Sequence, residues 1–143
     1  MDGLTVEPLT EANVAELVAF LDRVDQTYFN HTGSDALGFL AEPEDVHVLG
    51  RSEGTVVAFG MLRGWHEGYA TPSLGLAVAR DSEGRGFGRA MMAQLERLAR
   101  ERGARDIRLR VHPDNERARR VYEGCGYRRV GMERGQVLML REL

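Results

Sequence analysis

The sequence predicts a single mixed α/β (α+β) domain over residues 1–143, in which a sheet of about seven strands carries helices on its faces. The length of 143 residues, 43% of them hydrophobic, suits one compact domain that buries its own core. No internal repeat, low-complexity tract or interdomain linker interrupts it. The predicted elements follow the order β-α-α-β-β-β-α-β-α-β-β, which is typical of a mixed sheet covered by helices.

The first half of the chain is expected to hold a strand and two helices before a hairpin. Apolar residues recur every three or four positions from Val14 to Leu21, the spacing of an amphipathic helix, and Thr10 is a suitable N-cap. Ser52-Glu53-Gly54 separates two apolar runs, as a hairpin turn does. The expected elements are a strand at 4–8, helices at 11–23 and 35–40, and strands at 46–51 and 55–62.

The second half is expected to alternate strands and helices around glycine-containing turns. Apolar residues from Phe87 to Leu98 form a helical stripe that ends at Gly103, a suitable C-cap. The expected elements are strands at 73–79, 106–112, 127–131 and 136–141 and helices at 87–103 and 113–124.

The composition excludes several classes of protein. The single Cys125 allows no intramolecular disulfide, and no apolar run approaches the roughly 18 residues of a membrane span. The acidic N-terminus lacks the features of a signal peptide. Four scattered histidines and one cysteine do not make a metal site. These observations predict a cytoplasmic protein with no membrane partner and no metal.

The net charge of −3 hides an asymmetry between the two halves of the chain. Residues 1–79 hold 3 arginines and 12 acidic residues, whereas residues 80–143 hold 16 arginines and 10 acidic residues. This favours a cationic partner for the first half and an anionic partner for the second, although solvated helix faces give the same count. The arginines lack aromatic interleaving, so no nucleic-acid partner is expected.

Residues 76–89 join a buried strand to a helix through a turn with three alternating glycines, Gly84, Gly86 and Gly88. Free amides and the positive dipole end at a helix N-terminus suit a pyrophosphate, and Arg85 and Arg89 add charge. The turn lacks the Gly-Lys-Ser/Thr of a P-loop and the third small residue of a dinucleotide fingerprint. A tight turn without a ligand would use glycine too, so both interpretations stay open.

A second motif lies on the predicted helix that follows Pro113. Asn115 and Tyr122 are seven positions apart, about two helical turns, and therefore share one face with the small Ala118 between them. That face can lie along a ligand. The alternative is that Asn115 is only a helix cap and Tyr122 only a core residue.

Together the glycine turn, its helix and the second helix resemble the GCN5-related N-acetyltransferase (GNAT) family. The resemblance is close over residues 74–131 and extends in element order to nearly the whole chain. In the family the turn reads Arg/Gln-x-x-Gly-x-Gly/Ala and binds the pyrophosphate of acetyl-CoA. Gly86 and Gly88 match this pattern, whereas Glu83 departs from it and is expected to point away from the phosphates. The resemblance implies a mostly antiparallel sheet whose strands splay apart at the CoA site.

The resemblance also implies roles for individual residues. Val78, at the end of its strand, should bond pantetheine and the acetyl group through its backbone, and Asn115 should contact pantetheine or the phosphate arm. Tyr122 falls on the family's tyrosine that protonates the leaving thiolate, a role suited to a phenol of reference pKa about 10. The residues expected to bind acetyl-CoA are Leu76, Ala77, Val78, Gly84, Arg85, Gly86, Phe87, Gly88, Arg89, Asn115, Ala118 and Tyr122.

The acceptor side requires a group that deprotonates an amine. An alkyl ammonium of pKa near 10 is only about one part in a thousand neutral at pH 7, equivalent to roughly 4 kcal/mol. His66 and Glu67 are candidate bases, although a place in an exposed polar turn beside Gly64 and Gly68 is the simpler explanation of each. The strand that follows offers no carboxylate at residues 74–76. The residues expected around the acceptor are Asp25, Tyr28, Asn30, His31, Trp65 and Tyr69, and aromatic residues there could equally belong to the core.

The resemblance implies an acetyl-CoA-dependent N-acetyltransferase that acts by direct attack in a ternary complex. A small-molecule primary amine, such as an amino sugar or a polyamine, is the first choice of acceptor because the first half is acidic. A protein N-terminus is the alternative acceptor. An acyl-CoA-binding module without turnover and a structural or dimerisation domain are the alternatives of other classes. The sequence is compatible with a monomer or a homodimer.

Overall fold

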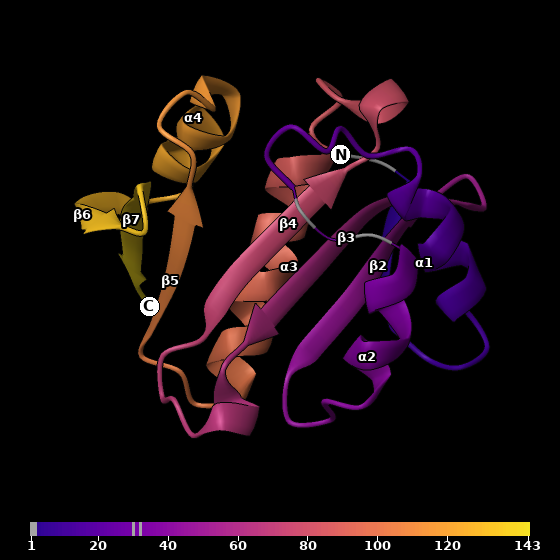
Figure 1. The fold of residues 1–143 in the computed structure, drawn as a ribbon, viewed down its shortest axis with the longest axis horizontal. Helices are drawn as coiled ribbons and strands as arrows, with labels where there is room; N and C mark the ends of the chain where they lie inside the picture. Colours follow the sequence, from indigo (N-terminus) through magenta and orange to yellow (C-terminus); the bar gives the residue numbers. More distant parts are fainter. Residues whose placement is uncertain (1–2, 30, 32) are drawn as a thin grey trace.

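The computed structural model describes residues 3–29, 31 and 33–143, which form a seven-stranded sheet with helices on both faces (Figure 1). The strand order is β1-β2-β3-β4-β5-β7-β6. Neighbouring strands are antiparallel except β4 and β5, which are parallel. In chain order the elements are β1 (Leu4–Pro8), α1 (Val14–Leu21), α2 (Ala36–Leu40), β2 (Val46–Ser52), β3 (Thr55–Arg63), β4 (Ser73–Val78), α3 (Phe87–Glu101), β5 (Asp106–Val111), α4 (Glu116–Gly124), β6 (Arg128–Glu133) and β7 (Gln136–Glu142). The predicted order and fold class are confirmed.

The β2–β3 and β6–β7 hairpins turn through two residues each. Glu53 and Gly54 both have positive φ, at 51° and 82°, as do Arg134 and Gly135, at 53° and 77°. Two successive residues with positive φ make the turn whose twist matches that of paired strands. The hairpin expected at Ser52-Glu53-Gly54 is therefore confirmed.

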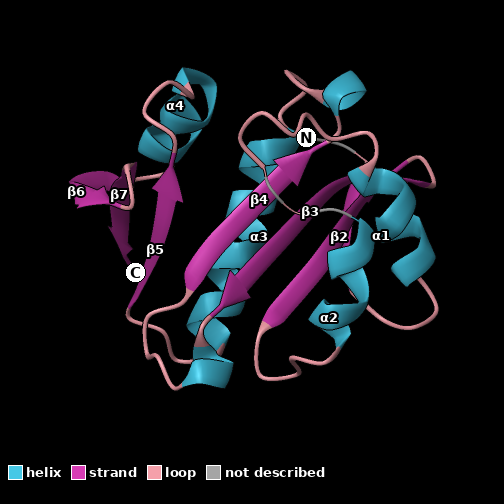
Figure 2. Ribbon diagram, in the orientation of Figure 1, coloured by secondary structure: helices cyan, strands magenta, loops and turns pink. Residues whose placement is uncertain are grey.

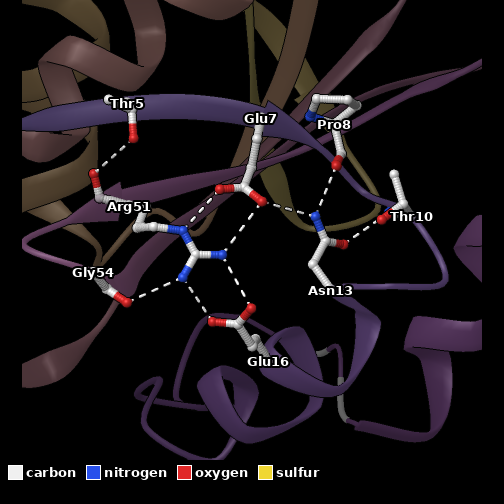
Figure 3. A network of polar contacts seen from close by, with 8 residues as sticks. All are labelled: Thr5, Glu7, Pro8, Thr10, Asn13, Glu16, Arg51 and Gly54. Carbon is white, nitrogen blue, oxygen red and sulfur yellow. Dashed lines mark hydrogen bonds and ion pairs between the residues drawn. The ribbon is translucent and has the colours of Figure 1, made fainter.

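The expected start of the first helix is wrong. Residues 11–13 form a turn and α1 begins at Val14, with Asn13 at the N-cap position in place of Thr10. The buried Asn13 amide points back toward β1, where its Nδ2 donates to the Pro8 carbonyl at 3.0 Å and its Oδ1 accepts from the Thr10 amide at 2.8 Å (Figure 3). Asn13 thus stabilises the turn that delays the helix.

An ion network joins α1 to the edge of the sheet (Figure 3). Arg51 of β2 donates to Glu7 of β1 at 2.8 Å and to Glu16 of α1 at 2.7 Å. Hydrogen bonds from the Arg51 guanidinium hold the pKa of each carboxyl below its usual range. These contacts fix where α1 lies on the sheet.

The sheet separates two apolar cores. Helix α3 and Tyr122 of α4 pack on one face, and α1 and α2 pack on the other (Figure 2). Glycines of the sheet allow α3 to approach closely, since a Cβ on Gly60 would lie 2.9 Å from Leu95 and one on Gly50 would lie 2.8 Å from Met91. In the described part of the chain, none of the helices has the length and apolar character needed to cross a membrane.

Strands β4 and β5 pair at a single position and then diverge. Ser73 is in register with Arg108, and the Arg108 amide donates to the Pro72 carbonyl at 3.0 Å. Beyond this pair the two strands separate toward their C-terminal ends (Figure 1). The expected splay is confirmed, and it opens the middle of the sheet.

Candidate active site

The divergence of β4 and β5 creates a cleft of about 1510 Å³. The cleft runs from the glycine turn before α3 to the segment between β3 and β4, and α4 lines it as well. Of the residues predicted to bind acetyl-CoA, all but Arg85 line this cleft. Those that do are Leu76, Ala77, Val78, Gly84, Gly86, Phe87, Gly88, Arg89, Asn115, Ala118 and Tyr122.

The glycine turn presents the N-terminus of α3 to the cleft. Gly84 and Gly86 have positive φ, at 78° and 85°, a conformation that disfavours side chains. Gly86 is the N-cap and no side chain caps the helix, so the first amides of this 15-residue helix are free to meet an anion. Gly88 faces β4, where a Cβ would lie 3.9 Å from Val78.

The backbone of β4 is unpaired along the cleft. The Pro72 carbonyl bonds β5, whereas the Ala79 amide bonds Val57 of β3 at 2.9 Å. Because backbone groups of successive residues point to opposite edges of a strand, those of Leu76 and Val78, which lie beyond the Ser73–Arg108 pair, face the gap that β5 leaves. An extended amide-bearing chain could pair with this free edge.

Two charged side chains of the turn make contacts of their own. Glu83 lines the cleft but is held by Arg117 of α4, with Oε1 3.0 Å from Nη1. Arg85 lies over the Phe87 ring, 4.9 Å from its centroid, outside the cleft lining. The negative charge of Glu83 is therefore compensated on the opposite wall of the cleft.

On helix α4, the residues of the second motif have a structural role and also line the cleft. Asn115 is the N-cap and its Oδ1 accepts from the Ala118 amide at 3.3 Å. The Tyr122 side chain is 8% exposed, and burial raises its pKa to about 12. Among the described residues its hydroxyl has no hydrogen-bond partner. Asn115 and Tyr122 are structural residues that also face the cleft.

Arg89 and Cys125 lie near the C-terminal end of α4 and have packing roles there. The Arg89 guanidinium packs against Gly124, where a Cβ would lie 2.7 Å from Nη1. Cys125 is half-buried, and burial raises the pKa of its thiol. A raised pKa disfavours the reactive thiolate, so packing accounts for this cysteine.

The two candidate bases lie on a short 3-10 helix, η2 (Trp65–Glu67), at the far end of β4 from Val78. Glu67 lines the cleft and its side chain is 59% exposed. His66 does not line it, because its Nδ1 contacts the buried Asp45 carboxylate, whose Oδ1 also accepts from the His66 amide at 3.2 Å. The His66 Nε2 lies 3.7 Å from Glu67 Oε1. Of the two, only Glu67 reaches the cleft directly.

Folding also gathers a cluster that the sequence did not indicate. One ligand atom each from Glu42, Asp45 and His66 lies within 4.8 Å of the others, a spacing that could hold a metal ion. Arg63 already supplies a positive charge there, with Nη2 2.9 Å from Glu42 Oε2. The nearby His47 is buried against the stacked rings of Phe39 and Phe59, and burial lowers its pKa to about 4.

The predicted acceptor residues divide into two groups. Asp25, Tyr28, His31 and Tyr69 line the cleft, whereas Trp65 packs under the Arg102 guanidinium, 5.1 Å from its ring centroid. Asn30 lies outside the described residues. The Tyr28 ring lies 5.0 Å from that of His112, which the sequence argument missed. His112 follows β5 and lines the cleft.

Apart from Arg89, the arginines of the cleft were not expected from the sequence. Arg63, Arg108, Arg110 and Arg134 also line the cleft. Among the described acidic residues of positions 3–79, only Asp25 and Glu67 line the cleft. The alternation in β5, where Ile107, Leu109 and Val111 are buried, is a signal that could have placed its two arginines on the opposite face.

Comparison with known proteins decides the family. The family model described as "Acetyltransferase (GNAT) family" matches residues 10–127. The chain belongs to the GNAT family. Curated relatives include acetyltransferases of Yersinia pestis (strain Pestoides F) and Yersinia pseudotuberculosis serotype I (strain IP32953), each 30% identical over 86 residues. These matches cover 60% of this chain and 59% of the length of each relative.

Solved structures agree with this GNAT fold. A GNAT-family acetyltransferase from Streptococcus pneumoniae superposes with a TM-score of 0.83 at 17% identity, covering 98% of this chain and 99% of the other. The GNAT domain of S. lividans PAT gives 0.84 at 24% identity, with 96% and 89% covered. The Thermoplasma acidophilum PaiA N-acetyltransferase, solved with coenzyme A, gives 0.79 at 12% identity, with 98% and 99% covered.

Proposed function

We propose that this GNAT protein transfers an acetyl group from acetyl-CoA to the primary amine of a small molecule, by direct attack of the amine in a ternary complex. One observation carries the proposal: a single cleft joins an uncapped helix N-terminus, an unpaired strand edge and a buried tyrosine to an open end that can admit an amine. Each part matches one part of the reaction.

The backbone of α3 and β4 supports the acetyl-CoA-binding part of the proposal. The free amides at the start of α3 bind the pyrophosphate, and Arg89 adds positive charge on the same wall. The free edge of β4 pairs with the pantetheine amides through Leu76 and Val78. This arrangement directs the thioester toward the gap between β4 and β5, where Tyr122 lines the cleft.

Tyr122 stabilises the leaving thiolate. Its raised pKa keeps the phenol protonated at neutral pH, so the hydroxyl can donate a hydrogen bond to sulfur as the carbon–sulfur bond breaks. Its lack of a partner among the described side chains leaves that hydrogen available.

Glu67 is the proposed base. Its exposed carboxylate lines the part of the cleft between η2 and β5, which we assign to the acceptor and call the acceptor end. There it can take the ammonium proton directly or through water. His66, fixed by Asp45, lies behind Glu67 and positions it.

A thiol-release assay tests the function. Acetyl-CoA is offered with polyamines, amino sugars, amino acids and short peptides, and free thiol is measured against time. The proposal predicts amine-dependent release of thiol with at least one small amine. Tight binding of acetyl-CoA with no release for any amine would instead identify a binding module.

A further inference from the structure

The acceptor end of the cleft carries more arginine than acid. Its wall includes Arg108 and Arg110 of β5, Arg134 of the β6–β7 turn and Arg63 of β3. The carboxylates on this side of the cleft are Glu67 and Glu133, together with Asp25, an expected acceptor residue that also lines the cleft. The surplus is positive, although the reaction requires an amine there.

The arginines stand on one face of the sheet at the point where the cleft begins. Arg63 is in register with Ser73, which is in register with Arg108, so the three residues form a row across β3, β4 and β5. Arg110 follows two positions later on the same face of β5. This is the face on which α1 and α2 pack, opposite to the core that holds Ile107.

Glu133 of β6 compensates only part of the charge on β5. Arg108 Nη2 donates to both Glu133 oxygens at 2.7 Å, and Arg110 Nη1 donates to one of them at 3.3 Å. Two guanidiniums therefore share one carboxylate, and their side chains are only 34% and 33% exposed. A partly buried positive charge without its own counter-ion favours an anionic ligand.

Arg63 differs from the β5 arginines because it has its own carboxylate. Its Nη2 lies 2.9 Å from Glu42, and its guanidinium lies 5.6 Å from the centroid of the Phe39 ring. The uncompensated charge therefore belongs to Arg108 and Arg110, with Arg134 beside their shared carboxylate.

We propose that the acceptor amine carries a carboxylate and that Arg108 and Arg110 bind it. This inference rests on the proposed acetyl transfer and names its substrate class: amino acids and other aminocarboxylates. A guanidinium fork matches a carboxylate in shape, and the positive charge that Glu133 leaves uncompensated on Arg108 and Arg110 attracts a negative charge. With the carboxylate on β5, the amine can turn toward Glu67. The same arginines repel polyamines, so the acidic surplus of the first half does not select the acceptor.

Matched pairs of acceptors test the inference directly. Each pair is an amino acid and the amine formed by its decarboxylation: alanine and ethylamine, phenylalanine and phenethylamine, lysine and cadaverine. The wild-type protein is expected to show a kcat/KM at least about 10-fold higher for the carboxylated member, the effect of one charge-assisted hydrogen bond. Aminomethylphosphonate replaces glycine in a further pair to separate a phosphonate from a carboxylate.

Variants assign the preference to the arginines. Arg110→Gln is expected to reduce the preference about 10-fold while the KM for acetyl-CoA stays unchanged, and Arg110→Lys is expected to keep part of it because the charge remains. Arg97→Gln is the control, since Arg97 pairs with Glu101 on the solvent side of α3.

The outcomes separate the two proposals. Turnover of the decarboxylated amines at equal or higher kcat/KM overturns the carboxylate site and keeps the acetyltransferase. A preference that survives Arg110→Gln in a folded variant also overturns it, as does a preference for the phosphonate. Failure of every amine to release thiol contradicts the acetyl transfer and, with it, this inference.

Discussion

Replacing Tyr122 by Phe removes one hydroxyl from a side chain that is 8% exposed and lines the cleft between β4 and β5. Burial raises the pKa of this phenol to about 12, whereas a thiol ionises near 8.5. Complete proton transfer to the thiolate would thus be uphill by about 3.5 pKa units, or about 5 kcal/mol. We therefore propose that Tyr122 acts chiefly by donating a hydrogen bond to the sulfur as its charge develops.

The size of the expected effect follows from that role. A hydrogen bond to a charged acceptor contributes about 1.5–3 kcal/mol, which corresponds to a loss of about 10- to 150-fold in kcat. The KM for acetyl-CoA should change little, because the aromatic ring still fills its place in the core. Steady-state kinetics with acetyl-CoA and an accepted amine measure both constants.

Tyr127→Phe is the matched control for this variant. Tyr127 is also buried, with its ring centroid 6.1 Å from that of Tyr122, but it does not line the cleft. Its loss of a hydroxyl should leave kcat near the wild-type value. A folded Tyr122→Phe protein with kcat within about twofold of wild type would refute the assignment of Tyr122.

Three further perturbations test the other parts of the site and the fold. Gly86→Val should abolish acetyl-CoA binding in calorimetry. Gly103→Val, at a similarly positive φ of 81° beyond the far end of α3, should keep that binding, and an equal loss of binding in both variants would point to backbone strain alone. Glu67→Gln should lower turnover at pH 7 and recover part of it at higher pH, where more of the amine is neutral, and His66→Ala should show the same effect more weakly. If both variants have the pH profile of the wild type, the base lies elsewhere. Glu7→Gln should lower the free energy of unfolding at pH 7. Because the pKa of Glu7 is depressed in the folded protein, the difference in free energy of unfolding between variant and wild type, measured by denaturant titration, should shrink as the pH falls below about 4.5. A difference that persists at that pH would exclude the ion pair with Arg51 as its cause.

Local patterns were enough to predict the elements and their order. The apolar stripe of α3 and the turn chemistry of Glu53 and Gly54 act over a few residues, and the structure confirms both. The predicted start of α1 was wrong because Asn13 contacts the preceding strand instead of leaving Thr10 to cap the helix. The Asn13 amide bonds to Pro8 on the neighbouring strand, a contact that no capping rule at Thr10 contains.

The proposed site also contains a part that local patterns predict and a part that depends on contacts between strands. The residues predicted to bind acetyl-CoA lie in two continuous segments, so their motifs could be recognised along the chain. The acceptor side is built across strands. The contact of Asp45 with His66 and the row from Arg63 to Arg108 depend on the register of β3, β4 and β5, which the sequence alone does not specify. For this reason the positive surplus at the acceptor end became visible only in the fold.

A single-turnover experiment distinguishes direct transfer of the acetyl group to the amine from transfer through an acetylated protein. Excess protein is mixed with acetyl-CoA, first alone and then with an accepted amine, and the masses of the protein and the amine are followed together with free thiol. With direct transfer, we expect no acetylation of the protein, including at Cys125, and formation of acetylated amine in step with thiol. An acetylated protein that later passes its acetyl group to the amine, or thiol release without an acetylated amine, would contradict it.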